Sequence, residues 1–205
     1  MSFKRFTILL PLLVAASGWS QSLRTVGIPS DSFDYVASMQ EAHDWCWAAS
    51  TQMILKWFGV EVSQVDVVQR IKGRIVDQSA SARDISAALN GVARQRSGSR
   101  AIIHAMSTAG PPPPVVIVKQ LSQRIPMLLT FDTGPHSGHA VVLTAARYYD
   151  TPKGPQIASL VIRDPYPSAF NMRNQGRIEL SGNDLTRFIR YVDRSWMVWV
   201  SKSRS

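Results

Sequence analysis

Hydrophobic positions in the first half of the chain recur with the period of an α-helix. The clearest run follows Cys46, and its apolar or small positions are Ala49, Met53, Ile54, Trp57 and Phe58. Gly59 suits the position just beyond the last helical residue, and the carboxylate of Asp44 can accept the free backbone N–H groups of the first turn. A helix is therefore predicted to begin near Asp44, with Cys46 in its first turn, and to end before Gly59.

Two shorter helices are predicted after it, each opened by a serine with an aspartate three positions later. These pairs are Ser63 with Asp66 and Ser81 with Asp84, the arrangement of a capping box with a carboxylate at its fourth position. The apolar stripes that follow are Val67, Val68 and Ile71 in the first helix and Ile85, Ala88 and Leu89 in the second. A glycine ends each helix. The chain up to about residue 91 is thus predicted to be helical, apart from a surface lead-in over residues 23–38.

The pattern changes to β-strands in the second half of the chain. Runs rich in β-branched or apolar residues, bounded by Gly, Pro and Asp, predict the strands 127–131, 139–146, 157–163 and 196–201. Residues 91–114 are expected to connect the halves, with a short strand at 101–104. A helix is predicted over 115–123, and a helix or turn after Ser181. Helices followed by strands indicate an α+β domain, in which a helical layer packs on an antiparallel sheet with a cleft between them.

The N-terminus has the pattern of a secretory signal peptide, predicted over residues 1–20. Lys4 and Arg5 precede the apolar residues 6–16, and small and polar residues follow. The run is shorter than the roughly 20 apolar residues of a membrane span, so an uncleaved anchor is the less favoured alternative. Residues 21–205 then form a single domain of ordinary size. The protein is expected to be exported, to the periplasm or to the medium.

The mature chain is predicted to be basic. The formal net charge of +9 falls by two, to +7, when Lys4 and Arg5 are removed. Such a balance favours anionic surfaces, including acidic cell-wall polymers. The positive residues are scattered, apart from Arg94, Arg96 and Arg100, so specific nucleic-acid binding is not expected. No integral membrane span is expected once the signal is removed.

Cys46 is the one cysteine of the chain, so it cannot form an internal disulfide. An unpaired thiol in an exported protein is exposed to oxidation, so the presence of Cys46 needs a functional or structural explanation. In the first turn of a helix, unpaired N–H groups and the helix dipole favour an anion, so the thiol should ionise more readily and act as a nucleophile. The alternative is a small buried core residue.

A cysteine nucleophile needs a base and a group that orients the base. His139 is the best candidate base, because it begins an apolar run after the loop 134–138 and so lies at the mouth of a predicted strand. His136, on the loop itself, is the less favoured alternative. Asp164 ends another predicted strand and could orient the imidazole, although an ordinary Asp-Pro turn is the simpler interpretation. Gln40 lies on the connection into the helix and could donate an amide N–H to an oxyanion.

These motifs resemble those of the papain-like cysteine peptidases. The matching residues are Gln40, Cys46 with Trp-Ala-Ala-Ser after it, His139 in Gly-His-Ala-Val-Val, and Asp164 in Ile-Arg-Asp-Pro. The resemblance is strongest to a compact bacterial group that includes the leader peptidases of peptide exporters, such as bacteriocin-leader peptidases, and some secreted effector cysteine proteases. It implies a papain-like α+β fold, with Cys46 as nucleophile, His139 as base, Asp164 as orienter and Gln40 as oxyanion donor.

Three functions remain open at this point. The first is an exported thiol hydrolase that cleaves peptide or isopeptide bonds of a peptide or protein substrate through an acyl-enzyme on Cys46. The second is a peptidoglycan amidase or endopeptidase with the same chemistry, and the third is a non-catalytic module that only binds peptides. No cofactor is expected. The His136–His139 pair lacks companion ligands, so a zinc site is not expected either. His104 is expected to be a structural residue, and Trp45 and Trp47 to pack against the helix rather than line a pocket.

Overall fold

The computed structural model describes residues 22–134 and 137–202, so the predicted signal peptide and His136 lie outside the described residues. The helices in this part of the chain are α1 (Ser30–Asp34), α2 (Cys46–Trp57), α3 (Gln64–Lys72), α4 (Ala82–Ala88), α5 (Pro114–Ser122), α6 (Ala169–Asn174) and α7 (Gly182–Tyr191). The strands are β1 (Leu23–Gly27), β2 (Gly91–Arg94), β3 (Arg100–Ala109), β4 (Met127–Gly134), β5 (Ser137–Thr151), β6 (Gly154–Arg163), β7 (Arg177–Ser181) and β8 (Val192–Lys202).

The strands form one eight-stranded antiparallel sheet, which confirms the predicted α+β class. Seven of them run in the order β2-β3-β8-β4-β5-β6-β7, and β1 pairs with the second half of β5. The long strand β5 is therefore the centre of the fold. Its first half pairs with β4 and its second half with β1, while β6 runs along its other edge.

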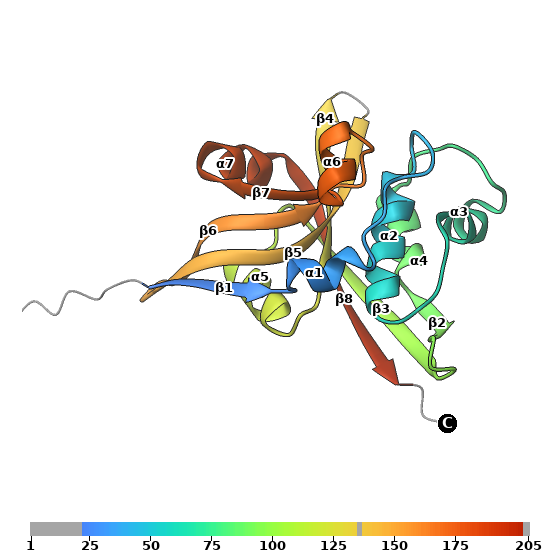
Figure 1. The fold of residues 1–205 in the computed structure, drawn as a ribbon, viewed down its shortest axis with the longest axis horizontal. Coiled ribbons are helices and arrows are strands. Elements are labelled where there is room, and N and C mark those ends of the chain that lie inside the picture. The colour runs from blue at the N-terminus through green and yellow to red at the C-terminus, as the bar shows by residue number, and fades with distance from the viewer. Residues whose placement is uncertain (1–21, 135–136, 203–205) are drawn as a thin grey trace, which may run out of the picture.

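Alternating residues of β4 and β5 divide the hydrophobic interior into two clusters, because successive side chains of a strand point to opposite faces. Leu128, Ala140 and Val142 belong to the cluster that contains α2, α3 and α4. Leu129 and Val141 belong to the cluster that contains α5 and α7. Figure 1 shows α2, α3 and α4 grouped at one end of the sheet, away from α7 and α5. The N-terminal helical half thus covers one part of the sheet, as predicted.

Both predicted capping boxes are present. The side chain of Ser63 accepts the N–H of Asp66 while Asp66 accepts the N–H of Ser63, and Ser81 and Asp84 form the same pair in α4. The predicted N-cap of α2 is wrong. Trp45 holds the N-cap position and makes no side-chain cap bond. The segment before α2 is instead held by side chains from elsewhere in the fold, which the local sequence pattern does not reveal.

The sheet extends further than the hydrophobic pattern predicted. Residues 91–114 form β2 and the ten-residue β3, which pairs with β8 along nine residues from Ala101 to Ala109. The predicted lead-in over 23–38 contains β1 and α1, and the region between β6 and α7 contains α6 and β7. These elements are short or half-exposed, so they have no clear local hydrophobic period. They are defined by their pairing with strands that are distant in the sequence. No helix in the described residues is long and apolar enough to cross a membrane.

Candidate functional site

Helix α2 places Cys46 in its first turn, facing the sheet. The thiol is free and half-buried. One turn later, the buried Ser50 hydroxyl donates to the carbonyl of Ala140 at 3.1 Å. Ala140 directly follows His139 on β5, so this bond fixes the start of the helix against the strand that carries the histidine. The first turn of a helix leaves backbone N–H groups without intrahelical acceptors, which favours a developing negative charge at this point.

Strand β5 places His139 opposite Phe131 of β4, where the two residues are paired in register. The Phe131 ring meets the imidazole edge-on, with ring centroids 5.6 Å apart and an interplanar angle of 83°. On the other side, Nε2 of His139 lies 2.6 Å from Oδ1 of Asp164. The imidazole also interacts with Cys46, the second group that raises its pKa. Because Nε2 faces the carboxylate, Nδ1 is the ring nitrogen left for the thiol.

Two opposing effects act on the charge of His139. Burial by itself lowers the pKa of the imidazole, but its hydrogen bond to the carboxylate of Asp164, the negative charge of that carboxylate and the interaction of the imidazole with Cys46 raise the pKa to about 9. The side chains of His139 and Asp164 are only 16% and 18% exposed, so water screens this pair weakly. The imidazole is therefore protonated at neutral pH, which places a proton donor beside the thiol of Cys46.

The backbone around Asp164 is fixed from several directions. Its Oδ1 accepts the N–H of Tyr166 at 2.9 Å as well as the imidazole N–H. Its own N–H donates to the carbonyl of Gly176 at 2.8 Å, and the N–H of Gln40 donates to Pro165 at 2.8 Å. The carboxylate is thus held at the end of β6 by contacts to both halves of the molecule.

Arg163, next to Asp164, is 99% buried and ties the end of β6 to α1. Its guanidinium pairs with Asp34 at 2.7 Å and donates to the carbonyl of Ser30 at 3.0 Å and that of Gln175 at 3.1 Å. It also lies over the ring of Phe33. A planar guanidinium can make these bonds at once, so Arg163 fixes the strand end from which Asp164 projects.

Gly176 offers a direct test of how Asp164 is positioned. Its φ is +70°, and a Cβ there would lie 2.3 Å from the carbonyl oxygen of Asp164. Gly176→Ala is expected to lower the free energy of unfolding by about 3 kcal/mol, from left-handed strain and this backbone clash. Displacement of Asp164 also weakens the bond that raises the pKa of His139, so that pKa should fall. Chemical denaturation and NMR titration of the histidine measure the two effects.

Gly73 provides the matched control. Its φ is +73°, and nothing lies within 4 Å of a Cβ built there. Gly73→Ala should therefore cost only the left-handed strain, about 1 kcal/mol, and should leave the pKa of His139 unchanged. Equal effects of the two substitutions would contradict the positioning role of Gly176.

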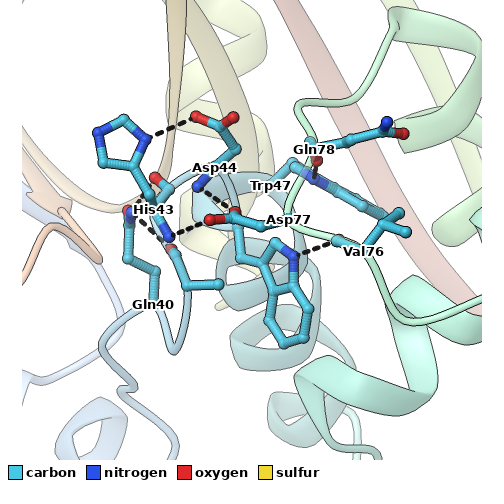
Figure 2. Close-up of polar contacts among 9 residues, drawn as sticks. Gln40, His43, Asp44, Trp47, Val76, Asp77 and Gln78 are labelled. Carbon is cyan, nitrogen blue, oxygen red and sulfur yellow. Dashed lines mark hydrogen bonds and ion pairs between the residues drawn. The ribbon is translucent and has the colours of Figure 1, made fainter.

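Gln40 lies beside the site but uses its amide within the loop that precedes α2. Its Nε2 donates to the carbonyls of Ala42 and His43 at 3.0 and 2.5 Å, as Figure 2 shows. The amide nitrogen therefore has two acceptors within the loop. Donation to an oxyanion would require the amide to rotate away from the loop, so the role predicted for Gln40 stays a prediction.

Two cavities flank the Cys46–His139 pair, and both residues line each of them. One cavity has a volume of about 330 Å³ and extends toward Trp47 and Trp196. The other has a volume of about 400 Å³ and extends toward Gln40, Asp164 and Tyr166. Because both cavities share these two lining residues, they adjoin at the pair and form the cleft of the site.

The 330 Å³ cavity is electrostatically negative although the whole chain is basic. Asp44, Asp132 and Asp193 line it, and no Lys or Arg occurs among the described residues that do. Trp47 also lines this cavity, although it is 99% buried and its indole N–H donates to the carbonyl of Gln78. The tryptophan thus both packs the helix and forms part of the wall. Carboxylates at this density favour positively charged groups in the cavity.

The sequence missed several residues that shape the site. In the sequence, Gly176 has only the features of a turn glycine, and Arg163 those of an ordinary charged residue. Asp77 lies in a segment that has no hydrophobic period. His104 lies outside the cleft, where its Nε2 is 3.1 Å from the hydroxyl of Ser201 and its ring stacks on Trp199. No group of three or more His, Cys, Asp or Glu side chains in residues 22–134 and 137–202 is arranged to hold a metal ion.

Comparisons with known proteins were informative at the level of family and fold. The family model described as Peptidase_C39 like family matches residues 32–178, well over half of the chain. No curated protein sequence matches it. Among solved structures, the peptidase domain of ComA from Streptococcus, a bi-functional ABC transporter involved in a quorum sensing pathway, is 16% identical, with a TM-score of 0.52 over 81% of this chain and 97% of that domain. UfSP from C. elegans is 14% identical, with a TM-score of 0.49 over 91% of this chain and 35% of that one. The likeness to the ComA domain shows a papain-like fold.

Proposed function

The chain belongs to the Peptidase_C39 like family, and from this premise we propose that it is an exported thiol hydrolase that cleaves peptide or isopeptide bonds. Cys46 is the nucleophile, His139 the base, and Asp164 the group that orients the base. A peptide or protein is the substrate, and the predicted signal peptide directs the enzyme to the periplasm or the medium.

One observation carries this proposal. The imidazole of His139 is held between the carboxylate of Asp164, at 2.6 Å, and the thiol of Cys46, and this row of groups lies where two cavities adjoin. A buried structural cysteine would need neither a charged imidazole nor an open cleft. The arrangement instead supplies a nucleophile, a proton carrier and space for substrate on both sides of the sulfur.

The proposed reaction has two steps. The thiolate of Cys46 attacks the carbonyl carbon, the C–N bond breaks, and protonated His139 gives its proton to the leaving amine, which departs with the C-terminal portion. Neutral His139 then takes a proton from water, and the hydroxide attacks the thioester, releasing the carboxylic acid and restoring the thiolate beside protonated His139. Asp164 keeps the imidazole oriented during both transfers.

The cavity charges support a preference among substrates. Because Asp44, Asp132 and Asp193 line one side of the cleft, peptides with Lys or Arg near the scissile bond should bind there more readily than acidic peptides. The basic surface of the mature chain supports an encounter with anionic cell-wall material, so a peptidoglycan cross-link is a second candidate substrate for the same chemistry.

A trapping experiment tests the proposal. The mature protein is incubated with a library of unstructured peptides that includes basic members, and separately with purified peptidoglycan, and is then quenched in acid for intact-mass analysis. The expected result is cleaved peptide together with an acyl adduct that maps to Cys46. Cleavage of peptidoglycan alone would identify an amidase or endopeptidase. Peptide binding without any adduct or product would contradict hydrolysis and identify a binding module.

A further inference from the structure

Residues 76–78 run beside the start of α2 and the loop before it, and contact them through three successive residues. The indole N–H of Trp45 donates to the carbonyl of Val76 at 2.8 Å, and that of Trp47 donates to the carbonyl of Gln78 at 3.1 Å. Between them, the carboxylate of Asp77 points into the loop, as Figure 2 shows. The segment therefore holds the start of α2 through groups on three successive residues.

The carboxylate of Asp77 accepts two successive backbone N–H groups of this loop. Its Oδ2 accepts the N–H of His43 at 3.2 Å, and its Oδ1 accepts the N–H of Asp44 at 2.7 Å. From the opposite direction, Nε2 of Gln40 donates to the carbonyls of Ala42 and His43. The peptide groups 42–43 and 43–44 are thus each held at both ends, by Gln40 at the carbonyl and by Asp77 at the N–H.

The held loop continues directly into the start of α2, where the N–H of Trp45 donates to the carbonyl of Ala42 at 3.3 Å. The N–H of Ala49 donates to the carbonyl of Trp45 at 2.9 Å, so the N–H of Cys46 precedes the first i to i−4 bond of the helix. A backbone N–H on the nucleophile itself is well placed to donate to the oxygen of a carbonyl under attack. Because the amide nitrogen of Gln40 contacts carbonyls of the loop, we consider this backbone N–H as the donor to the substrate oxygen.

We propose that Asp77 is a positioning residue that holds the 42–44 loop so that the N–H of Cys46 faces the carbonyl oxygen of the substrate. The proposal rests on the proposed function of Cys46. Ser79 is one of the described residues that line the two cavities, whereas Asp77 lines neither of them. Asp77 therefore acts through the backbone, without touching substrate.

The test compares Asp77→Ala with Asp66→Ala, which serves as a matched control. Asp66 also accepts a backbone N–H, that of Ser63 at 2.9 Å, but it lies in the capping box of α3 and lines neither cavity among the described residues. Asp77→Ala is expected to lower kcat for peptide cleavage by roughly 10- to 100-fold, with KM within about twofold, because a misdirected donor weakens transition-state stabilisation. Asp77→Asn keeps one acceptor oxygen and should give an intermediate kcat. Asp66→Ala should leave kcat unchanged.

Alkylation of Cys46 by iodoacetamide separates positioning from a loss of local folding. This displacement occurs at a tetrahedral carbon and forms no oxyanion, so its rate in Asp77→Ala should stay within about twofold of the wild-type rate. A parallel fall of alkylation and kcat would overturn the proposal, since it would mean that the site as a whole had been lost. A kcat equal to that of the Asp66→Ala control would overturn it as well.

Hydrogen–deuterium exchange over residues 40–48 gives a readout that needs no turnover. Asp77→Ala should raise exchange in this segment, because the two N–H groups lose their acceptor, while Asp66→Ala should not. If the wild-type protein cleaves no substrate, the proposed function fails by itself, and raised exchange still supports Asp77 as the residue that holds the loop. Unchanged exchange in Asp77→Ala would overturn the positioning role whether or not the protein is a peptidase.

Discussion

Replacing Cys46 by alanine is expected to lower the rate of peptide cleavage by roughly 10⁴-fold or more, to the background of the assay. The substitution removes the sulfur, so no acyl-enzyme can form, and His139 has no nucleophile beside it. Alanine is accommodated at the start of a helix, and Cys46 is only half-buried, so the free energy of unfolding should change by less than about 1 kcal/mol. Hydrolysis is followed by chromatography of peptide products, and folding by thermal denaturation.

Two further measurements make this result specific. Cys46→Ser keeps the shape of the side chain and supplies a weaker nucleophile, so its activity should also fall by at least about 10³-fold. Peptide binding to Cys46→Ala, measured by calorimetry, should persist, because the two cavities remain. Cleavage by Cys46→Ala at a tenth of the wild-type rate would show that another group performs the chemistry.

The sequence was informative wherever the deciding interactions are local. The capping boxes of α3 and α4 follow from a serine and an aspartate three positions apart, and the glycine at 73 ends α3 in the left-handed conformation. The start of α2 was harder, because Asp44 looks like an N-cap. Its backbone N–H instead donates to Asp77, which is 33 positions away. No local pattern contains that information.

The sheet shows the same division between local and distant information. The apolar cores of β4, β5 and β6 are visible as hydrophobic runs, whereas β1, β2 and β7 are short and half-exposed. Such strands are defined by their pairing with a long neighbour, which brings together residues that are far apart in the sequence. β1, for example, pairs with β5 from Leu23 opposite Tyr149 to Gly27 opposite Ala145.

The candidate site was accessible from sequence as three separate residues, and the fold brings them together. The residue types of Cys46, His139 and Asp164, and their places at predicted element ends, indicate each of them separately. Their contact depends on β5 and β6 being neighbours and on Ser50 fixing α2 to β5. The supporting residues Arg163, Gly176 and Asp77 could not be found this way, because each acts on a partner that is close only in space.

His139→Ala is the second substitution with a large expected effect, a fall of roughly 10³- to 10⁴-fold in kcat/KM. Without the imidazolium, the thiol loses the cation beside it and the leaving amine loses its proton donor. Alkylation of Cys46 by iodoacetamide at pH 6 should therefore slow as well, by at least about tenfold. His104→Ala is the matched control, since that histidine lies outside the cleft and contacts Ser201 and Trp199. An equally large fall of kcat/KM in His136→Ala would identify His136, and not His139, as the base.

The pH dependence gives the same assignment an independent test. Because the pKa of His139 is raised to about 9, the imidazole stays protonated up to that pH, and wild-type activity should fall as pH rises through about 9. The raised pKa also means that the folded state holds this proton more tightly than the unfolded chain, whose histidines titrate near 6.5. The resulting stabilisation is complete below about pH 6.5 and is lost as pH rises to about 9. Urea denaturation of wild-type and His139→Ala protein at pH 6 and pH 9 measures it, and an equal pH response of the two proteins would contradict the Asp164–His139–Cys46 arrangement.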